Sequence, residues 1–193
     1  MIITEKLYKL GLYIIIVCYV AISVLIESSA PSTFQYFTQT IGVGPGVFAI
    51  ITALYFIIAA CMQIPGGVVL DVFGFNKVVP ISMVGTILGL ILYWYARNEF
   101  VIELANIIWG VSLSIAYLIG IYIIPAFFSA ARIPLLLAIL GIGATLGNLS
   151  AYAPLTYLIN RIGWNTTGAI FIGILILLLI LFMLITAQMP NYK

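Results

Sequence analysis

Glu27 is the side chain most able to do chemistry here, because it follows a run with no charged residue from 10 to 26. If that run crosses a membrane, a carboxylate within it costs about 2.5–3.5 kcal/mol and usually faces a cavity or a partner. Such an acid can bind a proton or a cationic group. Glu27 also lies near the expected outer end of its helix, from where it can reach the outer headgroups. Both interpretations remain open from the sequence.

Other polar side chains recur at helical spacing. Tyr19, Ser23 and Glu27 are four residues apart, which places them on one helix face. Two later apolar runs show a similar spacing of three or four residues. The plainer alternatives are serines bonded to their own helix backbone and tyrosines that pack or anchor at the membrane surface. The candidate residues along a substrate path are Tyr19, Ser23, Glu27, Thr52, Tyr55, Asn106, Ser114 and Tyr117.

The absence of histidine excludes several kinds of site. A Ser-His or Cys-His nucleophile pair and a histidine-ligated metal both need that side chain. Cys18 and Cys61 lie in apolar runs, where cysteine is usually a small core residue. Glu27 has no paired carboxylate in its run. We therefore expect no enzyme, no metal site and no cofactor.

The composition describes the elements that must position these side chains. Charged residues make up 6% of the 193 residues, whereas a soluble domain has about 25%. Hydrophobic residues make up 65%, and the mean hydropathy is +1.30. A net charge of +2 is too small and too scattered for phosphate binding. The fold class is an all-α integral membrane protein in a lipid bilayer, with no nucleic-acid partner.

Charge-free runs predict six spanning helices, since each needs about 20 apolar residues. A polar stretch from 31 to 45, rich in Ser, Thr, Gln and Gly, is predicted to be a loop. The first helix resembles a signal peptide, but its apolar run is long and Pro31 would sit at the cleavage junction. We predict one six-helix bundle over 1–193. Its helices run from about 8–30, 46–66, 78–96, 102–127, 133–158 and 166–188.

Six crossings place both termini on the same side of the membrane. With that side inside, the inside segments carry five bases and the outside loops two. This excess follows the positive-inside rule and predicts cytoplasmic termini in a multi-pass cell-membrane protein. The inside bases are Lys6, Lys9, Lys77, Arg132 and Lys193, and the outside bases are Arg97 and Arg161.

The stretch from 63 to 77 carries the strongest local motif. Pro65 and the glycines after it are expected to end a helix and let backbones approach closely. Asp71 can cap a helix N-terminus or pair with a base. Gly74 suits a positive φ, and Lys77 can lie at the membrane surface.

This stretch resembles the cytoplasmic loop 2–3 signature of the major facilitator superfamily. The matching residues are Gly67, Asp71, Gly74 and Lys77. Bases that are common in the family's loop are replaced by Val72, Phe75 and Asn76. A weaker match places Arg132 in loop 4–5, and Gly163-Trp164 at the start of helix 6. Asn106 stands where many members have an arginine in helix 4.

The resemblance implies a fold and a function. Six helices correspond to the N-terminal bundle of a twelve-helix transporter. Alternating access then needs a second six-helix bundle, from a separate chain or a second copy. The implied activity is symport or uniport of a small solute, with Glu27 as a possible proton site and loop 2–3 as a gate. Since no Lys or Arg lies deep in a helix, this half favours a neutral, zwitterionic or cationic solute.

Two further points stay open. Gly143 and Gly147 form a small-residue stripe for close helix packing, or for a partner bundle. The alternative function is a truncated or non-transporting membrane protein that acts as an assembly partner.

Overall fold

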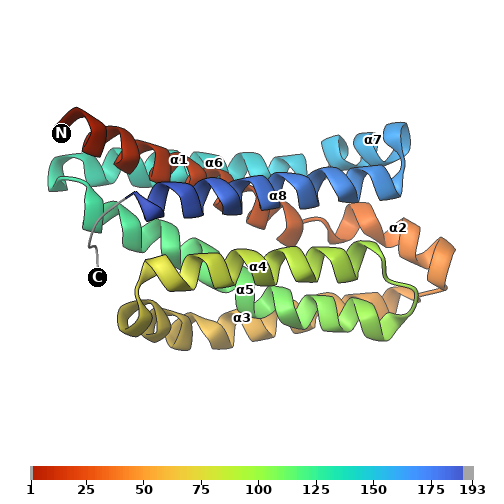
Figure 1. The fold of residues 1–193 in the computed structure, drawn as a ribbon. Helices are drawn as coiled ribbons and strands as arrows, with labels where there is room; N and C mark the ends of the chain where they lie inside the picture. The colour runs from red at the N-terminus through yellow and green to blue at the C-terminus, as the bar shows by residue number, and fades with distance from the viewer. Residues whose placement is uncertain (1, 189–193) are drawn as a thin grey trace.

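The fold is an all-α bundle with six helices that are long and apolar enough to cross a membrane (Figure 1). The structure, a computed structural model, describes residues 2–188, and side chains from residue 7 onward. The spanning helices are α1 (Ile2–Glu27), α3 (Pro45–Phe73), α4 (Phe75–Trp94), α5 (Glu99–Phe127), α6 (Ile133–Ser150) and α8 (Trp164–Ala187). A 3₁₀ turn, η1 (Ala130–Arg132), precedes α6. The predicted six-span membrane fold is confirmed.

Two short helices, α2 and α7, change the predicted boundaries. The loop expected from 31 to 45 is mostly α2 (Ala30–Ile41), and the first helix ends at Glu27 rather than near 30. The helix expected from 133 to 158 is split into α6 and α7 (Ala153–Ile162). Each short helix has a proline in its first turn, where the missing N–H costs nothing. Each ends at a glycine with positive φ.

The segment predicted as loop 2–3 is helical almost throughout. Helix α3 continues past Pro65 to Phe73, and Gly74 alone separates it from α4. The expectation that Pro65 ends the helix was wrong, because membrane helices tolerate proline where neighbours satisfy the backbone. The predicted positive φ of Gly74 is confirmed at 75°.

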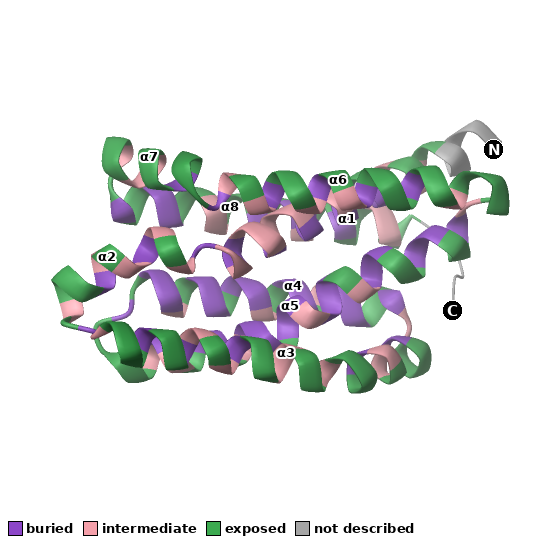
Figure 2. Cartoon of the chain, turned by 180° about the vertical axis from the view of Figure 1, so that it is seen from behind, coloured by how far each residue is buried: buried purple, intermediate pink, exposed green. Residues whose placement is uncertain are grey.

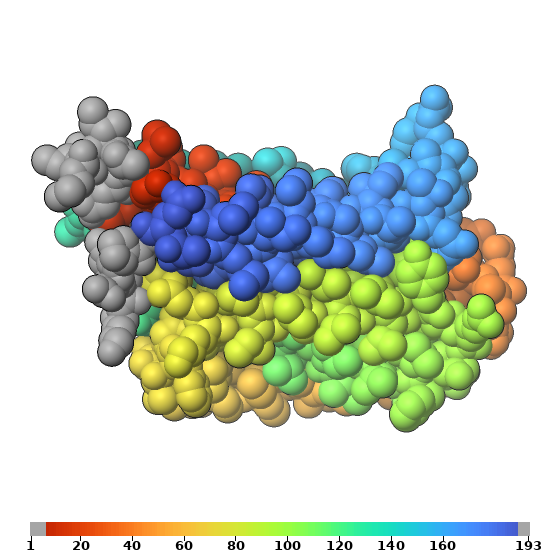
Figure 3. Space-filling model, viewed as in Figure 1, coloured from red at the N-terminus to blue at the C-terminus, as the bar shows by residue number. Residues whose placement is uncertain are grey.

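The helices lie in two groups along the bundle (Figure 1). Helices α3 and α4 pack on α5, and α6 packs on α1, while α8 contacts both α4 and α1. Helices α2 and α7 lie at the end opposite the termini. Helices α4 and α8 lie side by side on one face (Figure 3). Within the most apolar stretch of each span, 56% of the residues of α5 are buried inside the protein. The corresponding shares are 17% for α3 and 11% for the span that contains α6. Helices α3 and α6 therefore present broad exposed faces (Figure 2).

Side-chain hydrogen bonds join the two groups of helices inside the bundle. The Tyr19 hydroxyl on α1 lies 2.9 Å from the hydroxyls of both Ser82 and Thr86 on α4. Each indole N–H of Trp94 and Trp164 donates to the other residue's carbonyl at 2.7 Å, which joins α4 to α8.

Cys18 and Cys61 are exposed, so the expectation that they are core residues was wrong.

The glycine stripe of α6 packs on α1. A Cβ on Gly147 would lie 2.0 Å from the Ala21 carbonyl oxygen, and one on Gly143 would lie 2.9 Å from Val17. A Cβ on Gly141 of the same helix would meet nothing within 4 Å. This stripe serves close packing within the bundle.

We expect Gly147→Ala to destabilise the bundle by about 1–3 kcal/mol, because overpacking against backbone forces α1 and α6 apart. Gly141→Ala is the matched control and should be neutral or stabilising, since alanine is the better helix former. The fraction that survives heating in mild detergent, measured by size exclusion, compares them. Equal survival of the two variants would contradict this packing.

Candidate functional site

Glu27 lies inside the length of the bundle. Helix α1 ends at Glu27, but the chain turns at 28–29 and continues as α2 toward the end opposite the termini (Figure 1). The next helix is held deep in the fold, because the Thr33 hydroxyl lies 2.6 Å from that of Tyr93 on α4. Tyr36, also on α2, stacks on Trp164 with ring centroids 3.7 Å apart. In the sequence, Glu27 comes six residues before Thr33 and nine before Tyr36, so most of α2 lies between Glu27 and that end of the bundle.

The Glu27 carboxylate has a specific partner on α3. The Tyr55 hydroxyl donates a hydrogen bond to it. Tyr55 is 5% exposed, and Glu27 is half-buried. A carboxylate that accepts this bond keeps further lone pairs that can accept other donors.

A small cavity lies beside Glu27 and Tyr55. Its volume is about 10 Å³, roughly what one water molecule needs. Described side chains from α1 to α5 line it, and none of these is basic. Besides Glu27 and Tyr55, the lining includes Ala30, Thr52, Tyr93, Asn106 and Trp109.

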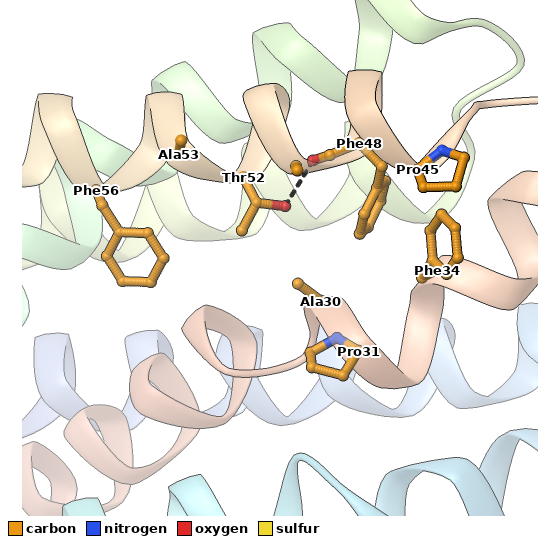
Figure 4. A pocket seen from close by; sticks show the side chains of 9 residues that line it. Ala30, Pro31, Phe34, Pro45, Phe48, Thr52, Ala53 and Phe56 are labelled. Carbon is orange, nitrogen blue, oxygen red and sulfur yellow. Dashed lines mark hydrogen bonds between the residues drawn. The ribbon is translucent and has the colours of Figure 1, made fainter.

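A larger apolar hollow adjoins this small cavity, between α2 and α3 (Figure 4). Its volume is about 480 Å³. Phe34 comes from α2, and Phe48 and Phe56 come from α3. Ala30 and Thr52 line both spaces, so the acid and the hollow are adjacent.

The predicted path residues fall into two sets. Glu27, Thr52, Tyr55 and Asn106 come together at the small cavity. The Thr52 hydroxyl donates to the Phe48 carbonyl at 2.9 Å, and the Asn106 amide donates to the Ile102 carbonyl at 2.9 Å.

The other set lies away from these cavities. Ser23 donates to the Tyr19 carbonyl at 2.8 Å, and Tyr19 itself is held by α4. Ser114 donates to the Val111 carbonyl at 2.8 Å. Tyr117 is 47% exposed on α5. These four side chains make local hydrogen bonds, pack against α4 or lie exposed, and their place on a substrate path stays a prediction.

Most of the lining residues were missed from the sequence, among them Tyr93, Trp109 and Phe34. Tyr93 and Trp109 were not singled out by any spacing, and Phe34 fell in the segment predicted to be a loop. The signal that finds Phe34 is its helical spacing of three from Phe37, which is fully buried. A helix prediction for 30–41 would have brought both into consideration.

The motif predicted to act as a gate lies at the junction of α3 and α4. Asp71 and Lys77 are exposed, and they flank Gly74. Gly67 has open space around its Cα, so the close helix approach is at Gly66, next to Ile115 and Leu118. Arg132 is exposed in η1, at the same end of the bundle as the termini (Figure 1).

A sequence model described as Major Facilitator Superfamily matches residues 15–192. This chain belongs to the major facilitator superfamily. The match confirms the resemblance seen in the loop 2–3 motif. Together with the six apolar helices, it makes the chain a multi-pass membrane protein of this family.

A curated relative gives a second comparison. It is the "Probable nitrate transporter NarT" of Staphylococcus epidermidis (strain ATCC 35984), which is 25% identical over 160 residues. The alignment covers 82% of this chain and 41% of the relative. The chain therefore spans less than half the length of this relative.

Proposed function

We propose that this chain is one half of a major facilitator transporter. It would move a small solute by alternating access with a second six-helix bundle, from another chain or a second copy. The observation that carries the proposal is the half-buried Glu27, bonded to Tyr55 and next to an apolar hollow. The alignment with less than half of a longer family member supports the need for a second bundle.

The lining of the two cavities bears on the solute. An acid lines the smaller cavity, and no Lys or Arg of the described part of the chain lines either space. An anion such as nitrate would meet the Glu27 carboxylate without a compensating base from this half. We therefore do not extend the relative's substrate to this chain, and we favour a neutral, zwitterionic or cationic solute.

Proton coupling through Glu27 is the second part of the proposal. A partly buried carboxylate that alternates between two protonation states can link solute movement to a proton gradient. The titratable groups that face it across the small cavity are Tyr55 on α3 and Tyr93 on α4. The lining residues include no second carboxylate and no base.

Uptake by membrane vesicles tests the proposed transport. Vesicles from cells that produce the chain are compared with vesicles from cells that lack it, using a panel of labelled small cations, zwitterions and neutral solutes under a pH gradient. We expect at least one solute to accumulate only with the chain. Equal uptake of every solute, with the chain correctly inserted, would favour the non-transporting assembly partner.

Membrane orientation is proposed from the charge distribution. Two of the inside bases, Lys6 and Lys193, lie outside the residues whose side chains the structure describes. Lys77 lies in the first turn of α4, and Arg97 follows the C-terminal end of that helix.

We expect Arg97→Cys, but not Lys77→Cys, to react with a membrane-impermeant maleimide added to intact cells. Both changes are made in a Cys18→Ala, Cys61→Ala background, because those two thiols are exposed. Permeabilised cells provide the control, in which both positions should react. The reverse labelling pattern would place the termini outside.

A further inference from the structure

We infer that the apolar hollow and the Glu27 cavity together bind an amphipathic organic ammonium ion. Its apolar body would lie between α2 and α3, and its N–H groups would donate to the Glu27 carboxylate. This inference rests on the proposed function, because it names the class of solute that this half of the transporter would hold.

The size and lining of the hollow fit an apolar body. A volume of about 480 Å³ lies within the usual range for small-molecule sites. The rings of Phe34 and Phe48 face the space from the two helices, with centroids 5.1 Å apart (Figure 4). Thr52 is the single polar side chain of the lining, and its hydroxyl donates within its own helix. An aryl or alkyl group would therefore meet apolar surface on both sides.

The charge at the small cavity fits a cation. Among the residues whose side chains the structure describes, Glu27 is the one charged side chain that lines either space. An ammonium and a carboxylate form a charge-assisted hydrogen bond, which is stronger away from water. Aromatic faces also attract cations, so Phe34 and Phe48 favour the same class. A carboxylate solute would be repelled by Glu27.

The apolar hollow and the Glu27 cavity are close enough for one molecule to contact both. Ala30 on α2 and Thr52 on α3 line both spaces, and Figure 4 shows them on opposite sides of the hollow. Because the Ala30 side chain is small, an ammonium group can approach Glu27 while the apolar body lies beside the rings of Phe34 and Phe48, which contact each other. A lipid acyl chain is the other occupant that this apolar lining would accept, and charge distinguishes the two.

Binding of three matched probes to the full chain in lipid nanodiscs tests the inference. The probes are 2-phenylethylammonium, neutral 2-phenylethanol and anionic 3-phenylpropanoate, measured by equilibrium dialysis against protein-free nanodiscs. We expect the ammonium to bind at least about tenfold more tightly than the alcohol, and the anion more weakly than both.

Variants separate the two parts of the site. Glu27→Gln should lose the preference for the ammonium and keep binding of the alcohol. Glu99→Gln, at an exposed acid outside both cavities, should bind as the unaltered chain does. Ala53→Leu, which narrows the hollow, should weaken all binding. Retention of monodispersity in detergent checks that each variant folds.

The possible results are distinct. Equal binding of ammonium and alcohol by the unaltered chain, or a preference that survives Glu27→Gln, would overturn the inference and favour a lipid-filled hollow. Ammonium binding without uptake in vesicles would leave the inference standing and contradict the proposed transport. Uptake of a solute with no ammonium preference would support the transport and overturn the inference.

Discussion

Glu27→Gln is expected to reduce proton-driven uptake by about tenfold or more and to remove its dependence on external pH. Glutamine keeps the size and accepts the hydrogen bond of Tyr55, but it cannot take up or release a proton. The measurement is the initial rate of uptake in vesicles over a range of external pH, with the internal pH fixed.

Glu99→Gln is the matched control, because Glu99 is an exposed acid at the start of α5. Its uptake and pH profile should equal those of the unaltered chain. Uptake that stays pH-dependent in Glu27→Gln would remove Glu27 from the coupling mechanism, and Glu27 would then be a structural or interfacial acid.

Asp71→Asn and Gly74→Val are each expected to lower uptake by about tenfold while insertion is unchanged. Gly74 has a φ of 75°, a conformation that costs a β-branched residue about 1–3 kcal/mol. Valine would therefore change the angle between α3 and α4. Asparagine at 71 removes the exposed charge that is available to a second bundle. Uptake rate and the amount of inserted chain are measured together.

Val72→Ala tests whether any change at this junction has the same effect. Val72 is 68% exposed and lies between Asp71 and Gly74. Its truncation should leave uptake unchanged. Normal uptake in both Asp71→Asn and Gly74→Val would argue against a gate, and it is the result expected of an assembly partner.

Much of the fold could be predicted from the positions of the charged residues. Every span was predicted because charged residues are rare and mark helix ends in a bilayer. Helix α2 was missed because its Ser, Thr and Gln residues are typical of loops, whereas here the buried Thr33 and Phe37 hold an amphipathic helix against the bundle. Pro65 misled the prediction for the opposite reason, since tertiary packing keeps α3 helical beyond it.

The site was predicted in part. Helical spacing correctly placed Tyr19, Ser23 and Glu27 on one side of α1, but spacing does not say which helix lies opposite. Helix α4 holds Tyr19 through two hydroxyls, and only Glu27 reaches α3 and Tyr55. Pairing between distant segments requires the packing of the whole bundle.

The central claim is that this chain works as half of a transporter. Its most direct test is the mass of the protein complex extracted from native membranes with a mild, lipid-preserving method. We predict a complex near twice the 21.1 kDa of this chain, or one that contains a second six-helix chain. A stable lone monomer would leave no path between two bundles and would rule out the half-transporter function.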